Sequence, residues 1–330
     1  LAAKIAELTP GDLNHVFFGN SGSDANDTNI RMVRHYWASK GKPTKQIVIS
    51  RENAYHGSTV AATALGGMTH MHVQGAENVG GLAHISQPYW WVNGGDMTPE
   101  DFGLKCAAEL ESKINELGED NVAAFIAEPI VGCGGQVPLA PGYLKTIYPE
   151  IRKQGGVCIS DEVQTGFCRT GKWFGFEHAG ISPDAVTMAK GMGNGMPVGA
   201  LWARRDVASV LQPGDHGSTY SGTALATAAV SAVISEMKRL HADELAIRQG
   251  ARLTKGLLAI PKVESVRGAG LLLGAQLVDG LVAGDVYKAL LEKGLIVNAV
   301  NASTLRLAPP LTVSDAEIDE AVALIEEVLS

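Results

Sequence analysis

Short apolar segments alternate with helical segments over most of this chain, and this alternation restricts its fold more than any other feature. The apolar segments predict buried strands, at residues 16–18, 47–49, 123–127, 157–160, 185–188 and 198–202. Helical patterns lie between several of them, for example over residues 24–39 and 102–117. Near-continuous apolar strands separated by helices are typical of a mostly parallel sheet with helices on both faces. We therefore predict an α/β domain.

From about residue 223 the pattern changes and predicts a second, smaller domain. A helix over residues 224–240 leads to another that begins near residue 242. Strands are then expected at residues 270–278, 294–298 and 304–308, before a helix from residue 315 to the end. The prediction is a large α/β domain at residues 1–222, followed by a connecting helix and a small α+β domain at residues 223–330. Two domains suit a length of 330 residues.

Composition excludes several classes of function. Hydrophobic residues make up 45% of the chain and charged residues 19%, as in a packed globular protein. A net charge of −8 with scattered Lys and Arg argues against nucleic acid and membrane surfaces as partners. No apolar run reaches the ~18 residues that a membrane span needs. The 4 cysteines form neither a C-x-x-C pair nor a Cys/His cluster, so we expect a cytoplasmic protein without disulfides or structural zinc.

Lys190 and Asp161 are the strongest candidates for chemistry. Each follows a predicted strand, at the edge of the sheet where α/β proteins bind ligands. Lysine forms Schiff bases with carbonyl compounds once its ammonium, normally with a pKa of about 10.4, has lost a proton. A buried aspartate beside the nitrogen of a pyridine cofactor keeps that nitrogen protonated and makes the ring an electron sink. An isolated lysine at a strand end is more often a solvated surface residue, so other motifs must support the pair.

Two loops rich in small residues are candidates for binding phosphate. Residues 19–26 follow a strand and open a helix, where backbone N–H groups lie at the positive end of the helix dipole. The same residues fit an ordinary helix start in which Ser23 or Asp24 is the N-cap. Residues 216–222 form the second such loop before a helix. Between them in sequence, Tyr55 either lies over a planar cofactor or packs in an ordinary turn.

Glu128 and Asp161 end neighbouring predicted strands and could form a metal-binding or acid/base pair. Neither has a histidine at metal-ligand spacing, so no metal is expected. A second interpretation accounts for more residues at once. In it, Asp161 is the partner of a protonated ring nitrogen, and Gln164 donates a hydrogen bond to the phenolic oxygen of the same cofactor.

The order of the short motifs resembles that of the class III aminotransferases, which are pyridoxal-phosphate enzymes of the aspartate-aminotransferase fold (fold type I). The motifs that carry the resemblance lie at residues 21–23, 55–57, 128–129, 161–166, 169–171, 183–184, 189–191 and 217–219. The resemblance covers essentially the whole chain. The resemblance implies that Lys190 forms the Schiff base with pyridoxal 5′-phosphate, that Asp161 holds the ring nitrogen and that Tyr55 stacks on the ring.

The resemblance also implies the remaining contacts with the cofactor. Gln164 would contact the phenolic oxygen, and Gly22 and Ser23 would bind the phosphate. Thr219 would reach the phosphate held by the neighbouring subunit, which implies a homodimer with shared active sites. Further contacts with the cofactor are expected from Ser21, His56, Glu128, Val163 and Ser218.

The implied activity is ping-pong transfer of an amino group to a keto acid such as pyruvate, glyoxylate or 2-oxoglutarate. Arg306 would bind the substrate carboxylate through its planar guanidinium. The donor stays open among ω-amino acids, amines and acetylornithine-like compounds, because three stretches resemble three subfamilies. Residues up to 102 look most like ω-amino acid:pyruvate transaminases, residues 155–195 like alanine:glyoxylate aminotransferase type 2, and residues 295–311 like acetylornithine aminotransferase.

Two departures from the family pattern accompany this resemblance. Family members normally carry a sizeable segment before the position of Leu1, which contributes to the small domain and the substrate pocket. Members that alternate between ω-amino donors and 2-oxoglutarate often have a Glu where Cys133 stands, paired with the arginine at the place of Arg306. Two alternatives therefore stay open: a lyase or aminomutase on the same scaffold, and an inactive or truncated homologue.

Overall fold

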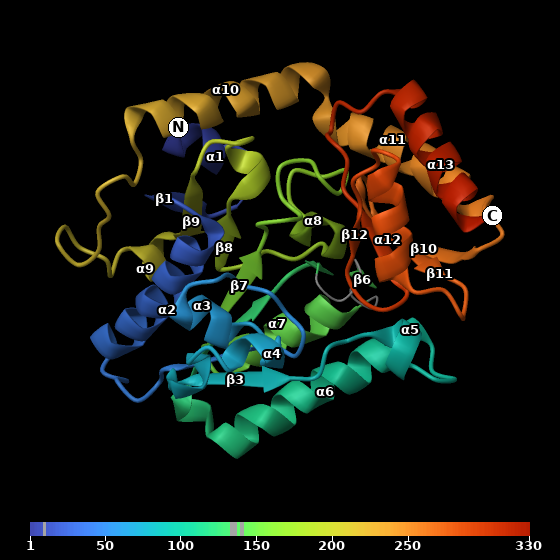
Figure 1. Cartoon of the computed structure of the whole chain (residues 1–330). Coiled ribbons are helices and arrows are strands. Elements are labelled where there is room, and N and C mark those ends of the chain that lie inside the picture. The colour runs from blue at the N-terminus through green and yellow to red at the C-terminus, as the bar shows by residue number, and fades with distance from the viewer. Residues whose placement is uncertain (9–10, 133–136, 139–141) are drawn as a thin grey trace. The chain divides into compact units, whose positions relative to one another are not determined.

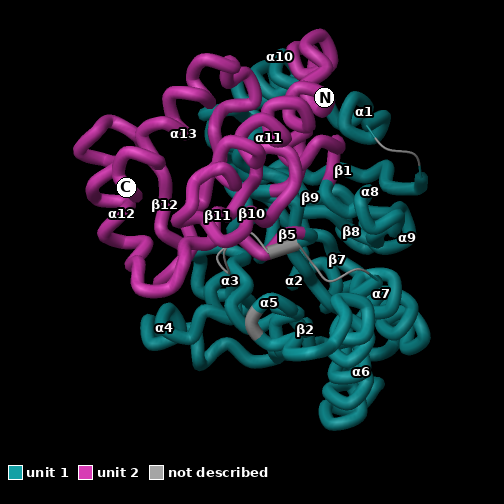
Figure 2. The backbone as a smooth tube through the Cα atoms, turned by 90° about the vertical axis from the view of Figure 1, so that its right-hand side faces the viewer, with its two compact units in different colours: residues 1–129, 139–164, 175–234 teal, residues 130–138, 165–174, 235–330 magenta. Residues whose placement is uncertain are grey.

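The computed structural model of the chain describes all residues except 9–10, 133–136 and 139–141. It forms two compact units, which Figure 2 shows in separate colours. Unit 1 comprises Leu1–Pro129, Leu139–Gln164 and Gly175–Ile234, and unit 2 comprises Ile130–Pro138, Thr165–Phe174 and Ser235–Ser330. The division into domains at residues 1–222 and 223–330 stays a prediction, because compactness does not show which part folds by itself.

Unit 1 contains a seven-stranded sheet in the order β1-β9-β8-β7-β4-β2-β3 (Figure 1). Its strands are β1 (Leu13–Gly19), β2 (Ile47–Arg51), β3 (Leu82–Ile85), β4 (Val122–Ala127), β7 (Val157–Asp161), β8 (Ala185–Met188) and β9 (Gly199–Arg204). Only the pairings of β9, with β1 and with β8, are antiparallel. The predicted mostly parallel sheet is confirmed, and β3 is an additional edge strand.

Helices cover both faces of this sheet because its strands are apolar on both sides. Successive side chains of a strand point to opposite faces, so Val48 and Ile49 of β2 belong to different core clusters. Val48 packs with Ile30 and Val33 of α2, whereas Ile49 packs with Leu110 of α6.

The helices of unit 1 are α1 (Ala2–Ala6), α2 (Gly22–Ser39), α3 (Val60–Leu65), α4 (Thr69–His72), α5 (Trp90–Asn93), α6 (Pro99–Leu117), α7 (Tyr143–Lys153), α8 (Phe176–Ala179) and α9 (Arg205–Ala208), with short 3₁₀ turns η1 (Ala76–Asn78), η2 (Glu119–Asn121) and η3 (Lys190–Met192). The helix α10 (Ala224–Leu240) begins in unit 1 and ends in unit 2. Among the described residues, no helix combines the length and apolar character needed to cross a membrane.

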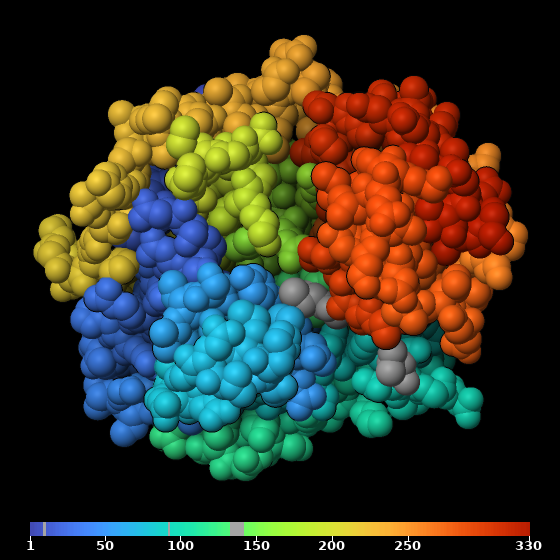
Figure 3. Space-filling model, viewed as in Figure 1, coloured from blue at the N-terminus to red at the C-terminus, as the bar shows by residue number. Residues whose placement is uncertain are grey.

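Unit 2 contains a four-stranded antiparallel sheet in the order β10-β11-β13-β12. Its elements are β5 (Ile130–Val131), β6 (Val137–Pro138), α11 (Ala242–Leu258), β10 (Val263–Ala269), β11 (Leu272–Leu277), α12 (Ala283–Glu292), β12 (Asn298–Ala299), β13 (Thr304–Leu307) and α13 (Asp315–Leu329). Leu305 and Leu307 of β13 are buried with Leu253 of α11 and Ile318 of α13. On the face shown in Figure 3, residues of α12 form part of the outer surface of this unit.

One strand prediction in unit 2 is wrong. Residues 294–298 were expected to form a strand, but only Asn298 is in one, at the start of β12. The preceding residues complete the end of α12 instead. Gly294 has a φ of 86°, and the N–H groups of Gly294 and Leu295 donate to the carbonyls of Leu291 and Leu290. These N–H groups satisfy helix carbonyls, so they are not available to a strand partner.

Candidate functional site

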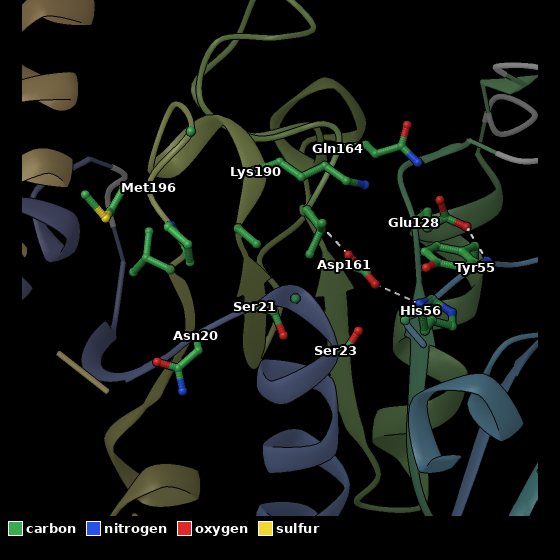
Figure 4. A pocket seen from close by; sticks show the side chains of 17 residues that line it. Asn20, Ser21, Ser23, Tyr55, His56, Glu128, Asp161, Gln164, Lys190 and Met196 are labelled. Atoms are coloured by element: carbon green, nitrogen blue, oxygen red, sulfur yellow. Dashed lines mark hydrogen bonds and ion pairs between the residues drawn. The ribbon is translucent and has the colours of Figure 1, made fainter. Parts of the chain in front are cut away.

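A cavity of about 350 Å³ lies in unit 1 at the carboxyl ends of β7 and β8, where parallel sheets bind ligands. Its wall also includes the start of α2, the segment after β2 and the end of β4 (Figure 4). The sequence-predicted residues that line it are Ser21, Gly22, Ser23, Tyr55, His56, Glu128, Asp161, Val163, Gln164 and Lys190. Residues that are far apart in sequence are thus brought together in one pocket.

Asp161 is the last residue of β7 and is 4% exposed. Its Oδ2 accepts hydrogen bonds from His56 Nδ1 at 2.7 Å and Asn26 Nδ2 at 3.0 Å, and its Oδ1 accepts one from the Val163 N–H at 3.1 Å. Burial by itself raises the pKa of this carboxyl, but the hydrogen bonds, led by the one from His56, outweigh burial and lower the pKa below its usual range. Asp161 is therefore an anion at neutral pH.

Lys190 occupies an unusual backbone conformation just after β8. Its φ is 43°, in the left-handed region that residues other than glycine seldom adopt. Hydrogen bonds from Met192 N to Ala189 O at 2.9 Å and from Gly193 N to Lys190 O at 3.1 Å stabilise the turn. The exposed side chain of Lys190 extends into the pocket toward Gln164 (Figure 4). Strained residues of this kind concentrate at functional sites, and here the strain accompanies an amine directed into the cavity.

The start of α2 provides a place for an anion. Ser21 is the N-cap, and its side chain accepts a hydrogen bond from Asp24 N at 3.1 Å. N–H groups in the first turn of a helix have no acceptor within the helix and lie at its positive end. Gly22 packs closely against the pocket wall, because an added Cβ would lie 2.9 Å from Val163 Cγ2. Together with Ser23, these residues form a backbone surface suited to phosphate.

Glu128 and the segment after β2 form another part of the wall. The buried carboxylate of Glu128 accepts a hydrogen bond from the Tyr55 N–H at 3.2 Å, so it helps to fix the backbone that carries the tyrosine ring. Gly57 has a φ of 140°, and an added Cβ there would lie 2.5 Å from Ser23 Oγ. Only glycine lets this segment approach the start of α2 so closely. Among the described residues, no three His, Cys, Asp or Glu side chains form a group that could hold a metal ion.

Some predicted site residues are not in this pocket. Ser218 and Thr219 do not line it, although Ser218 Oγ accepts a hydrogen bond at 2.9 Å from Asn20 Nδ2, and Asn20 does line it. Arg306 lies in unit 2, half-buried on β13. Cys133, where family members often have Glu, lies outside the described residues.

Sequence reasoning missed Asn26, which contacts Asp161 directly, and Thr187, which contacts Asn26. A signal for Asn26 was present in the helical pattern. Asn26 and Asn29 fall on the same face of α2 as Ile30 and Val33, at the spacing that predicts burial. Polar residues on the apolar face of a helix need buried partners, and here those partners belong to the site.

Solved structures define the class of this protein. An ω-transaminase from Pseudomonas jessenii in complex with PMP matches the fold with a TM-score of 0.94 and 32% sequence identity, covering 99% of this chain and 77% of the other. The protein is a transaminase with the fold of the pyridoxal-phosphate-dependent enzymes. More specifically, the sequence model of "Aminotransferase class-III" matches residues 1–329, and the chain belongs to that family.

Two aminotransferases are similar to this chain in sequence over its whole length. The putrescine–pyruvate aminotransferase of Pseudomonas aeruginosa is 42% identical, over 100% of this chain and 76% of the relative. The acetylornithine aminotransferase of Caldanaerobacter subterraneus subsp. tengcongensis is 36% identical, over 100% of this chain and 79% of the relative. The family depends on pyridoxal phosphate. These matches confirm the predicted family, fold class and enzyme class, and they lend no support to a lyase, an aminomutase or an inactive homologue.

Proposed function

We propose that this chain binds pyridoxal 5′-phosphate in the pocket of unit 1. With it, the chain moves an amino group from an ω-amino acid, amine or acetylornithine-like donor to a keto acid in a ping-pong reaction. The observation that carries the proposal is the presence in one cavity of an anionic Asp161 and of the Lys190 amine. The names of the two relatives, which include a diamine, pyruvate and acetylornithine, support this range of substrates.

The residues of the pocket fit the cofactor. A carboxylate has about four lone-pair positions, and Asp161 accepts three hydrogen bonds, so one position remains for a ring N–H. The ion-pair partner that the structure gives Asp161 is His56, at 2.7 Å. The remaining acceptor position of the carboxylate suits the protonated ring nitrogen of a ligand. The start of α2 suits the phosphate, and the half-buried Gln164 amide suits the phenolic oxygen.

Each side chain then has a defined task. When bound, pyridoxal phosphate supplies a carbonyl carbon that takes an amine and a ring that accepts the electron pair released at the donor carbon. Asp161 keeps the ring nitrogen protonated. Lys190 Nζ would hold the cofactor, and its free amine would serve as general base and acid for the proton at the donor carbon. Tyr55 orients the ring by stacking on it.

The proposal includes a homodimer with shared active sites. Ser218 and Thr219 would contact the phosphate bound in the pocket of the other subunit. Two observations support this arrangement: both side chains are exposed, and neither lines the cavity of its own chain. The Asn20–Ser218 hydrogen bond holds this loop against the pocket wall. A cytoplasmic location is also proposed, supported by three buried cysteines that are free thiols, Cys106, Cys158 and Cys168.

The test of the cofactor site is chemical labelling. After incubation with pyridoxal phosphate and reduction with borohydride, peptide mapping should find the label on Lys190. Lys190→Ala should abolish the label and lower turnover by at least about 10²–10⁴-fold, the usual contribution of general acid–base catalysis. Lys172→Ala, which changes an exposed lysine, should behave as wild type. A label that persists on another lysine in Lys190→Ala contradicts the assignment.

The test of substrate class uses donor and acceptor panels with Arg306→Ala. A charged hydrogen-bonded pair contributes about 1.5–3 kcal/mol, so the variant should raise KM for keto acids about tenfold to a hundredfold. KM for amines without a carboxylate should stay nearly unchanged, because they make no such pair. Arg239→Ala, at an exposed arginine of α10, is the matched control. Equal effects on both kinds of substrate would assign Arg306 a structural role.

A further inference from the structure

Behind Asp161, a continuous chain of hydrogen bonds runs through the interior of unit 1. Asn29 Nδ2 donates to Thr187 Oγ1 at 2.7 Å, and Thr187 Oγ1 donates to Asn26 Oδ1 at 2.7 Å. Asn26 Nδ2 then donates to Asp161 Oδ2 at 3.0 Å. The exposed fractions of Asn26, Asn29 and Thr187 are 0%, 1% and 0%. None of these three residues lines the pocket, so they act on a ligand through neighbours that do, of which Asp161 carries the charge.

The chemistry of the terminal groups decides which atom donates and which accepts in each of these hydrogen bonds. A carboxylate and a backbone carbonyl can only accept hydrogen bonds. Asn26 Nδ2 faces one of each, because it also lies 2.7 Å from the backbone O of His56. The amide nitrogen of Asn26 must therefore point to these two acceptors, and the amide oxygen is left to accept. Thr187 consequently gives its only hydroxyl proton to Asn26 and accepts a hydrogen bond from Asn29.

The chain of hydrogen bonds joins the elements that carry the proposed cofactor contacts. Asn26 and Asn29 are three residues apart and share one face of α2, the helix whose first turn lines the pocket. Thr187 pairs directly with Asp161 across β8 and β7. The strand β8 then leads into Lys190. One buried network thus links the helix start, the carboxylate and the strand that precedes the lysine.

Apolar side chains would be easier to bury at this position. Elsewhere α2 packs on the sheet through residues such as Ile30 and Val33, whereas a buried polar group without a partner costs about 1–3 kcal/mol. The polar side chains are accommodated because each one donates a hydrogen bond to the next, although the buried oxygen Asn29 Oδ1 has no hydrogen-bond partner. The network also fixes the orientation of the Asn26 amide. If that amide rotated by half a turn, its oxygen would face two acceptors, Asp161 Oδ2 and the backbone O of His56.

We propose that Asn26, Thr187 and Asn29 are positioning residues that hold the Asp161 carboxylate as a fixed anion aimed at the protonated ring nitrogen of the cofactor. This inference rests on the proposed function, because that nitrogen belongs to pyridoxal phosphate. Thr187 is the central member. Without its hydroxyl, Asn26 Oδ1 loses its donor, so the amide is held only on its nitrogen side, by Asp161 and the backbone O of His56, and fixes the carboxylate less firmly.

The affinities of two ligands separate positioning from packing. Pyridoxamine 5′-phosphate has an amine in place of the aldehyde, so its affinity reports noncovalent contacts without a link to Lys190. Its analogue with carbon in place of the ring nitrogen offers no N–H to Asp161. Thr187→Val keeps the shape of the side chain and removes the donor. This variant should lower the affinity for pyridoxamine phosphate about threefold to tenfold, the value of one hydrogen bond. Its affinity for the carbon analogue should stay unchanged. Thr187→Ser restores the hydroxyl and should recover wild-type affinity.

Each outcome of this titration decides the matter. Equal losses for both ligands in Thr187→Val would indicate packing alone and overturn the proposal, as would unchanged affinity for both. If Thr187→Val fails to fold, Asn29→Leu replaces it, with a smaller loss expected for pyridoxamine phosphate only. Equal effects on the two ligands in that variant also overturn the proposal. A wild-type protein that binds neither ligand and takes no borohydride label at Lys190 overturns the proposed function itself, which is a distinct result.

Discussion

Unit 1 buries two aspartates at opposite ends of its central strands, and their surroundings differ. Asp184 lies just before β8, with an exposed fraction of 1%. Its Oδ1 pairs with Arg152 NH2 at 2.8 Å and Arg204 Nε at 3.3 Å, and its Oδ2 accepts a hydrogen bond from the Cys158 N–H at 2.7 Å. Two arginines therefore balance this charge within the protein. The carboxylate ties α7, β7 and β9 together at the end of the sheet remote from the pocket.

Asp161 ends the neighbouring strand and has a similar number of hydrogen bonds but no arginine. Its donors are a backbone N–H, the amide of Asn26 and the ring of His56. They hold the charge without cancelling it through a lysine or arginine of the described residues. The comparison shows that burial of a carboxylate does not identify a functional site. Asp184 pairs with two arginines, whereas the partners of Asp161 are hydrogen-bond donors and His56, as we expect if Asp161 serves a cationic ligand.

The largest expected effect comes from substituting Asp161, which tests its proposed role directly. Removing one member of a buried charge pair costs about 3–5 kcal/mol, and each 1.36 kcal/mol is about tenfold in rate. If Asp161 serves the ring nitrogen, Asp161→Asn should lower turnover about a hundredfold or more, even though the cofactor still labels Lys190. The free energy of unfolding without cofactor should fall by no more than about 1 kcal/mol, the net value of a hydrogen bond. Near-normal turnover in this variant would remove the electron-sink role.

Asp184→Asn should have the opposite profile. It leaves Arg152 and Arg204 without their shared anion, but both arginine side chains reach solvent, with exposed fractions of 42% and 31%. The loss in free energy of unfolding should therefore be about 1–3 kcal/mol, below the value for a fully buried pair. Turnover per folded, cofactor-loaded molecule should stay within about threefold of wild type.

Denaturant titration measures the free energy of unfolding. Turnover divided by the concentration of cofactor-loaded protein measures the effect on catalysis. Asp206→Asn is the matched control, because Asp206 pairs with Arg204 at 3.4 Å on the surface. That variant should change the free energy of unfolding by less than about 0.5 kcal/mol. A large loss of turnover in Asp184→Asn, at full cofactor occupancy, would mean that the two aspartates do not differ in the way proposed.

Local patterns were enough to predict most of the fold. The strands and helices of unit 1 follow apolar periodicity that neighbouring residues already show, and Asp161 and Lys190 stand in motifs at the carboxyl ends of two of these strands. The strand expected at residues 294–298 failed because its apolar side chains look alike in a strand and after a helix. The deciding feature was the left-handed Gly294, which directs the next N–H groups back to α12.

The contacts that distinguish Asp161 from Asp184 could not be predicted in the same way. Asn26 and Asp161 are 135 positions apart, and Thr187 and Asn26 are 161 apart, so their contact depends on how α2 packs on the sheet. The arginines of Asp184 come from a helix and from a strand, and neither position stands out in the sequence. Motifs predict which residues carry charge. The packed structure decides which charges the protein balances itself.

The smallest expected effect concerns acid, and it tests whether Asp161 is held as an anion. A carboxyl whose pKa is lower in the folded state than in the unfolded chain stabilises the fold above the unfolded pKa of about 3.9. That stabilisation is lost as the pH falls below this value toward the folded pKa. Asp161 has a lowered pKa, led by its hydrogen bond from His56. The free energy of unfolding of wild type should therefore fall more steeply below about pH 4 than that of Asp161→Asn.

The difference in slope cannot exceed about 1.4 kcal/mol per pH unit, the value for one proton, and it should vanish above about pH 5. Denaturant titrations of both proteins without cofactor, from pH 3 to pH 7, measure it. Glu236→Gln is the control, because Glu236 also has a lowered pKa, from its hydrogen bond with Arg239, but lies exposed on the surface. Solvent screens that pair, so this variant should follow the wild-type curve. Parallel curves for wild type and Asp161→Asn would mean that the hydrogen bonds around Asp161 do not favour its charged form, and its contrast with Asp184 would then rest on geometry alone.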